Sequence, residues 1–147
     1  MSIVKTLRFP ASIEWRGGRL TRASSPGKPS LDVATPPEFK GGVPGVWSPE
    51  DLLVAAVGSC FAVTLVAVAE RSGVELTVLD VDGVGHIERA ADGRFRFTVI
   101  ELDVEVEADA DPGRLERLAA KAEQVCIVSL ALDVPVHVRL LDTARAA

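Results

Sequence analysis

The sequence predicts an α+β domain in which helices cover one face of an antiparallel sheet. Alternating apolar and polar residues mark several strands, and two segments carry the capping residues and the apolar pattern of helices. The predicted order is strands, helix, hairpin, helix and a last strand. A chain of 147 residues has the usual length of one domain, so we expect residues 1–147 to form a single domain.

The amino-acid composition argues against several classes of protein. Lys and Arg total 16 and Asp and Glu total 21, which gives a net charge of −5 and argues against a nucleic-acid-binding protein. Aromatic residues are only 5% and Tyr is absent, which argues against a site that stacks bases or sugars. The 48% of hydrophobic residues indicate a folded protein rather than a disordered one.

The N-terminal third is predicted to be strands and loops. Residues 3–16 alternate as a strand does, and Gly17-Gly18 is a turn signal. Residues 19–33 then form a returning strand or a loose hairpin, interrupted by Ser24-Ser25-Pro26-Gly27. Residues 36–45, rich in Pro and Gly, lead as a loop to the first helix.

The first helix is predicted over residues 48–72. Ser48 is a suitable N-cap, Pro49 fits the first helical position, and Gly73 suits the position after the end. Because residues 52–69 contain no charge, the segment reaches the lower edge of membrane-spanning length. Polar and small residues dilute it and charges flank it closely, so we interpret it as a core helix that needs a partner subunit to cover it, with no membrane.

The remaining elements also have local signals. Residues 75–89 are predicted as a strand, Asp92-Gly93 as a hairpin turn, and residues 95–106 as the second strand, with a β-bulge near Val99 where the apolar residues change face.

The second helix begins at Asp111-Pro112, which is a cap followed by proline. One apolar stripe then faces the core: Leu115, Leu118, Ala119, Ala122, Val125 and Cys126. Residues 134–141 form the last strand, and Pro135 indicates an edge or a strand start.

The two cysteines, Cys60 and Cys126, are the residues that suggest chemistry. They are too few for a disulfide-rich domain and too far apart for a CxxC pair, which favours a cytoplasmic protein. His86 and His137 are interpreted as structural, so we expect no metal.

From the pattern alone, both cysteines are either core residues or a reactive pair. A reactive Cys60 needs a stabilised thiolate, and it lies too far from the helix start to benefit from the dipole. A cation is therefore expected near it, and the candidates are Arg16, Arg19 and Arg22.

Three segments of the sequence form recognisable motifs: residues 48–61, SPEDLLVAAVGSCF, residues 125–129, VCIVS, and Gly17-Gly18-Arg19. The first two resemble the two cysteine motifs of the OsmC/Ohr family, the osmotically inducible protein C and organic hydroperoxide resistance proteins. The third is similar to the stretch that carries the family's arginine. Leu20, Ile127 and the Leu52-Leu53-Val54 run depart from the Ohr pattern, so we place the chain in the general OsmC-like branch.

The resemblance implies an intertwined homodimer with long central helices, in which the strands of residues 1–46 are shared with the partner. It implies a cysteine-based hydroperoxide reductase, with Cys60 as the peroxidatic cysteine and Cys126 as the resolving one. Arg19 would hold the thiolate and Glu50 would orient that arginine. No cofactor is implied, and the reductant would be a dithiol such as a lipoylated protein.

Helix geometry adds that one subunit cannot place Glu50 beside Cys60, because ten helical positions span about 15 Å. We therefore expect the site to combine residues of both subunits. Trp47, Phe39 and Phe61 are the candidates for binding an apolar substrate. Two alternatives stay open, namely a redox sensor or apolar-ligand-binding protein of the same fold, and a purely structural cysteine pair.

Overall fold

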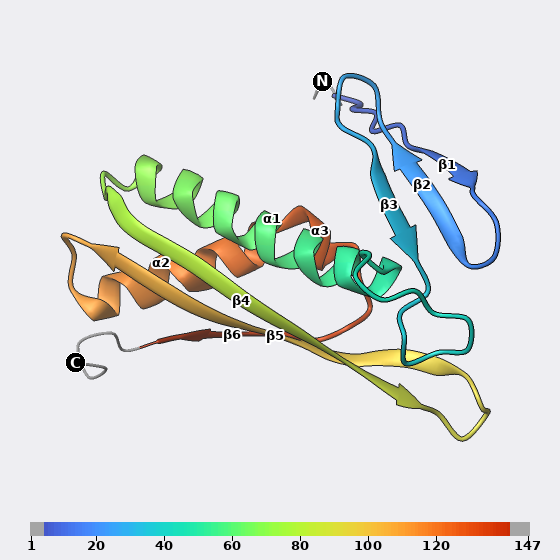
Figure 1. Ribbon diagram of the computed structural model, residues 1–147. Helices are drawn as coiled ribbons and strands as arrows, with labels where there is room; N and C mark the ends of the chain where they lie inside the picture. Colours follow the sequence, from blue (N-terminus) through green and yellow to red (C-terminus); the bar gives the residue numbers. More distant parts are fainter. Residues whose placement is uncertain (1–4, 142–147) are drawn as a thin grey trace. The chain divides into compact units, whose positions relative to one another are not determined.

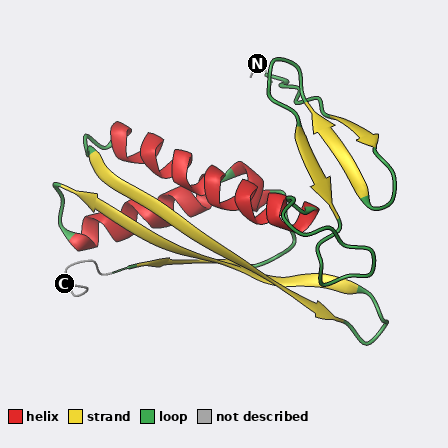
Figure 2. Ribbon diagram, viewed as in Figure 1, coloured by secondary structure: helices red, strands yellow, loops and turns green. Residues whose placement is uncertain are grey.

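The computed structural model describes residues 5–141, and the chain divides into two compact units, residues 1–52 and 53–147. The elements in chain order are β1 (Ser12–Trp15), β2 (Leu20–Ser24), β3 (Leu31–Ala34), α1 (Pro49–Arg71), β4 (Leu76–Arg89), β5 (Phe95–Ala108), α2 (Pro112–Val125), α3 (Ile127–Leu130) and β6 (Val136–Leu140) (Figures 1 and 2). This content confirms the α+β fold class.

The N-terminal unit contains a three-stranded antiparallel sheet in the order β1-β2-β3. Gly17 and Gly18 form the first turn with φ angles of 100° and 55°, which non-glycine residues rarely adopt. The first strand is shorter than predicted, because Pro10 lacks an N–H for a ladder; residues 3 and 4 of that prediction lie outside the described range. Residues 19–33 form two strands, separated at the predicted interruption.

Helix α1 begins and ends where its capping residues predict. The hydroxyl of Ser48 accepts the backbone N–H of Asp51 at 3.0 Å, and a carboxylate oxygen of Asp51 accepts the N–H of Ser48 at 2.9 Å. This reciprocal capping box satisfies two donors of the first turn. At the other end, Gly73 adopts a φ of 72° and terminates the helix.

The C-terminal sheet is mixed, which corrects the prediction of a purely antiparallel sheet. Strands β4 and β5 form the predicted hairpin, but β6 pairs with β5 in parallel. The reason is the connection: β5 and β6 are joined by α2 and α3, and such a crossover returns the chain in the same direction. The bulge predicted near Val99 is present, because His86 pairs with Val99 while Ile87 pairs with Phe97.

Helix α2 begins as predicted, with the side chain of Asp111 accepting the N–H of Arg114 at 2.9 Å. It ends at Val125, one residue earlier than the apolar stripe indicated, and Val125 is 48% exposed rather than facing the core. Cys126 lies in the break between α2 and the short helix α3, which the sequence pattern did not predict.

Both helices pack on one face of this sheet (Figure 1). Helix α1 approaches β4 closely because Gly83 and Gly85 have no side chain. A Cβ on Gly85 would lie 2.7 Å from a methyl of Val54 and 2.6 Å from the ring of Phe97. By length and composition α1 would also suit a membrane span, as core helices of soluble proteins do, and its buried residues belong to the core of this unit.

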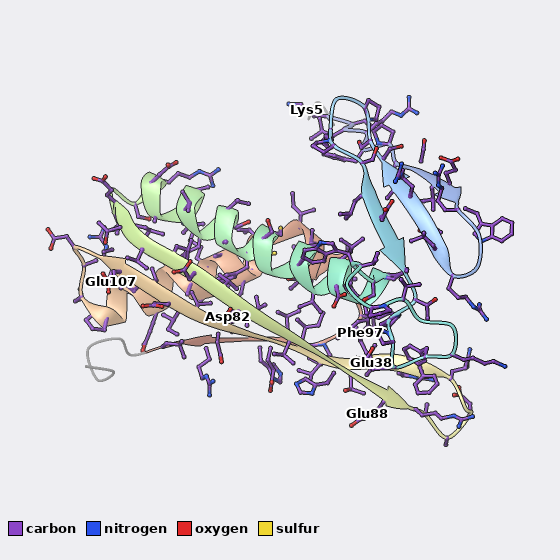
Figure 3. All side chains as sticks on the ribbon, viewed as in Figure 1. Lys5, Glu38, Asp82, Glu88, Phe97 and Glu107 are labelled. Carbon is purple, nitrogen blue, oxygen red and sulfur yellow. The ribbon has the colours of Figure 1, made fainter. Side chains whose placement is uncertain are left out.

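The other faces of these elements differ sharply in polarity. On β5 the residues that alternate with the buried ones are Glu101, Asp103, Glu105 and Glu107, and the sheet face away from the helices is therefore acidic (Asp82 and Glu107 are labelled in Figure 3). Helix α1 instead exposes a face of small and apolar residues at helical spacing: Ala55, Ala56, Ser59, Val63 and Val66.

Candidate active site

The structure brings the two cysteines together inside the C-terminal unit. Cys60 is half-buried on α1, and Cys126 is 1% exposed at the junction of α2 and α3. Both are free thiols, and the side chain of Cys126 is hydrogen-bonded to that of Cys60. Packing of α1 against the α2–α3 junction thus brings together two cysteines that are 66 positions apart in the sequence.

The environment of Cys60 favours the thiolate. Burial acts to raise the pKa of the Cys60 thiol, but four hydrogen bonds to its sulfur outweigh burial and lower this pKa below the usual value of 9.0. The donors are the backbone N–H of Val128, the thiol of Cys126, the hydroxyl of Thr64 and the backbone N–H of Ile127. A thiolate held in this way is the nucleophilic form of cysteine.

None of these four donors is a cation, although the sequence analysis expects one beside Cys60. Two are backbone groups at the start of α3, where the first N–H groups of a helix have no partner within the helix. The backbone donor at position 127 could have been anticipated from the sequence. Ile127 replaces the proline that is usual in the related motif, and proline has no N–H to donate. Thr64 could also have been anticipated, because it follows Cys60 by four positions and residues at this spacing are neighbours on a helix surface.

A second hydroxyl acts on Cys126. Ser129 donates from Oγ to Sγ of Cys126 over 3.3 Å. We call Cys60, Thr64, Cys126, Ile127, Val128 and Ser129 the dithiol cluster. Each sulfur in it therefore has its own hydroxyl partner.

A pocket of about 180 Å³ adjoins the dithiol cluster at Ser129. Its walls are mainly apolar and are formed by Phe61, Leu130, Val134, Val136 and Val138, together with Ser129 and the side chain of Glu123. Burial raises the pKa of Glu123, and the nearby His137 opposes this only in part. Phe61, a predicted substrate-binding residue, is 1% exposed and belongs to the core as well as to this wall.

The other predicted site residues, Arg19, Glu50, Trp47 and Phe39, belong to the N-terminal unit. Arg16 is paired with Glu14 at 3.1 Å and Arg22 with Asp32 at 2.8 Å. Within residues 5–141, Arg19 has no carboxylate partner.

The structure does not pair Arg19 with Glu50. Oε2 of Glu50 is buried and has no hydrogen-bond partner among the described residues. The described part of the N-terminal unit thus contains a guanidinium without a carboxylate partner and a buried carboxylate oxygen without a hydrogen-bond donor. Trp47, at 49% exposure, lines a shallow pocket with Gly45, Val46 and Asp51.

The histidines take part in no metal site of the described residues. Nε2 of His86 lies 3.0 Å from a carboxylate oxygen of Glu101 on the exposed sheet face. Between residues 5 and 141, no group of three or more His, Cys, Asp or Glu side chains is arranged to hold a metal ion.

An α+β scaffold on which a half-buried, readily ionised cysteine is hydrogen-bonded to a second cysteine defines a paired-thiol protein. The family model for OsmC-like proteins matches residues 42–140, which is more than half of the chain. The chain belongs to this OsmC/Ohr family, as its two cysteine motifs indicated.

Individual relatives agree with this assignment. The Bacillus subtilis (strain 168) protein YmaD, described as uncharacterized, is 29% identical over 138 residues, covering 90% of this chain and 91% of that protein. An OsmC-like protein of unknown function from Vibrio cholerae has the same fold, with a TM-score of 0.84, 16% identity, and coverage of 92% of this chain and 100% of that one. An organic hydroperoxide resistance protein, OsmC, from Legionella pneumophila matches at a TM-score of 0.77 and 25% identity, with 93% and 97% covered.

Proposed function

We propose that the protein is a thiol-dependent peroxidase that reduces organic hydroperoxides through Cys60 and Cys126. Family membership, which includes relatives named organic hydroperoxide resistance proteins, supports a redox or peroxidase-related role. The observation that carries the proposal is the hydrogen bond between the two thiols, with the lowered pKa of Cys60. An antioxidant role in the oxidative stress response follows from this activity.

In the first step, the Cys60 thiolate attacks the distal oxygen of the hydroperoxide. The O–O bond breaks, the alkoxide takes a proton and leaves as the alcohol, and Cys60 becomes a sulfenic acid. The donors that hold the sulfur before the reaction lower the pKa of Cys60 and so favour its thiolate form. The hydroperoxide is the oxidant and Cys60 is oxidised by two electrons.

In the second step, Cys126 condenses with the sulfenic acid to form a disulfide and release water. The contact between the two side chains supports this step, because a disulfide requires sulfurs that can approach each other. An external dithiol, of the lipoyl type that the family resemblance implies, then reduces the disulfide by thiol–disulfide exchange. Cys60 and Cys126 return as thiols and the dithiol leaves as its own disulfide.

The same proposal includes a homodimer in the cytoplasm. The exposed apolar face of α1 supports a partner subunit, because such a face is costly to leave in water. Free thiols fit a reducing compartment. Among residues 5–141, Arg19 has no carboxylate partner and Oε2 of Glu50 has no hydrogen-bond donor, which supports their joining one site that the second subunit completes, with Arg19 acting on the Cys60 thiolate.

The test is a free-thiol count with intact mass after one equivalent of cumene hydroperoxide. It compares wild type, Cys126→Ser and Cys60→Ser. We expect wild type to lose both thiols without gaining oxygen, and Cys126→Ser to gain one oxygen on Cys60. Cys60→Ser is the matched control and should keep its remaining thiol. Survival of both wild-type thiols in excess peroxide would show that the pair is structural.

A redox sensor that also binds an apolar ligand is the second candidate, and the apolar pocket beside the dithiol cluster favours it. Sensor and peroxidase share the oxidation of Cys60 and differ in turnover. With excess hydroperoxide and dihydrolipoamide, a peroxidase consumes many equivalents of peroxide per subunit. A sensor consumes one equivalent of peroxide per subunit and then stops.

A further inference from the structure

The two hydroxyls of the dithiol cluster act on different sulfurs. Thr64 is hydrogen-bonded to Cys60, whereas Ser129 donates to Sγ of Cys126 over 3.3 Å. Cys126 is 1% exposed, so bulk water does not compete with this bond. Cys126 is in turn hydrogen-bonded to Cys60. The three side chains therefore form a continuous hydrogen-bonded chain from Ser129 through Cys126 to Cys60.

We propose that Ser129 is a positioning residue for the resolving step, and that its hydroxyl holds the sulfur of Cys126 towards Cys60. This inference rests on the proposed peroxidase function and adds a residue to it. Cys126 is the N-cap of α3 and Ser129 lies three positions later in the same single-turn helix, so this turn places the hydroxyl of Ser129 next to the sulfur of Cys126.

The chemistry of the step explains why a donor at this sulfur matters. The sulfur of Cys126 attacks the sulfur of the Cys60 sulfenic acid, a new S–S bond forms, and the S–O bond breaks. The oxygen leaves as water with the proton of the sulfenic acid and the proton of the Cys126 thiol. A hydroxyl that donates to the attacking sulfur restricts the rotamers of Cys126 and keeps this sulfur oriented towards Cys60.

Removing this hydroxyl should not disturb the fold. Ser129 lines the pocket of about 180 Å³, so alanine enlarges an existing space instead of leaving an isolated void in the core. Threonine at the same position keeps the hydroxyl. Thr77→Val is a matched control, because it removes a hydroxyl that donates to the carbonyl of Glu107 over 3.1 Å, outside the dithiol cluster.

The experiment follows wild type, Ser129→Ala, Ser129→Thr and Thr77→Val after one equivalent of cumene hydroperoxide. Samples are quenched with an alkylating reagent at successive times and analysed by intact mass. We expect Ser129→Ala to form the sulfenic acid at the wild-type rate but the disulfide about three- to tenfold more slowly, since a single hydrogen bond is at stake. Excess peroxide should then convert more Cys60 to sulfinic acid. Ser129→Thr and Thr77→Val should behave as wild type.

Disulfide formation at the wild-type rate in Ser129→Ala overturns the positioning role. So does equal slowing in Ser129→Ala and Ser129→Thr together with a lower melting temperature in both, which would mark a packing role. A wild-type protein that forms neither sulfenic acid nor disulfide overturns the proposed function itself, and this result is distinct because it does not involve Ser129.

Discussion

Replacing Ile127 with proline removes one hydrogen-bond donor of Cys60 and changes little else. Ile127 is the first residue of α3, a position that proline favours, and its side chain is 78% exposed. The preceding residue, Cys126, has φ −69° and ψ 106°, which is the extended conformation that a residue before proline adopts. The backbone therefore accepts the substitution, and the N–H is the main loss.

The magnitude follows from the hydrogen bond. A bond to a charged group contributes about 1.5–3 kcal/mol when fully desolvated, but Cys60 is half-buried and Ile127 is the weakest of its four donors. About 1 kcal/mol is then lost, which reduces the thiolate fraction roughly fivefold below the titration midpoint. The pKa of Cys60 moves back towards its usual, higher value.

The assay is the rate of Cys60 alkylation by iodoacetamide over a range of pH, with the Cys60 peptide quantified by mass spectrometry. Ile127→Ala is the matched control, because it loses the side chain and keeps the N–H. Ile127→Pro should be slower than this control on the acidic side of the profile and equal to it at alkaline pH, where both are thiolates. Superimposable profiles for the two variants would refute the role of this backbone donor.

Three further predictions follow from packing and charge. Gly85→Ala should lower the free energy of unfolding by about 1–3 kcal/mol in urea titrations, since its Cβ would overlap Val54 and Phe97. Burial raises the pKa of Glu123, so the fold prefers its protonated form and loses stability as the pH rises from the unfolded value of 4.5 through the folded one. Glu123→Gln should therefore melt at a higher temperature than wild type at neutral pH, and at the same temperature at acidic pH below 4.5. Val63→Glu places a charge on the exposed face of α1 and should lower the mass found by light scattering from a dimer to a monomer, whereas an unchanged mass would argue against that interface.

The elements that the sequence predicts well are those with local signals. Ser48 and Asp111 cap α1 and α2 at the predicted residues, because a cap is a contact between neighbours in the chain. The parallel direction of β6 depends on how the crossover folds back, which residue types do not encode. The break at Cys126 likewise escapes a periodicity argument, since a stripe predicts a continuous helix.

The same distinction applies to the site. Cys60 and Cys126 are visible as residue types within motifs, and the sequence identified both. Half of the donors to Cys60 are backbone N–H groups of Ile127 and Val128, and a backbone group has no signature of its own. These two N–H groups therefore could not be predicted from residue types, and a cation beside Cys60 stays a prediction.

The position of Cys126 on the connection between β5 and β6 has a consequence for the whole domain. A bond from Cys60 to Cys126 would tie α1 to that connection and close a covalent loop across 66 sequence positions (126 − 60). A disulfide that closes a loop of this length lowers the conformational entropy of the unfolded chain, which raises the free energy of unfolding by about 4 kcal/mol. Oxidation and reduction of the two thiols would then alternate between a cross-linked, heat-resistant domain and a more easily unfolded one, so the melting curve would report the redox state of the protein.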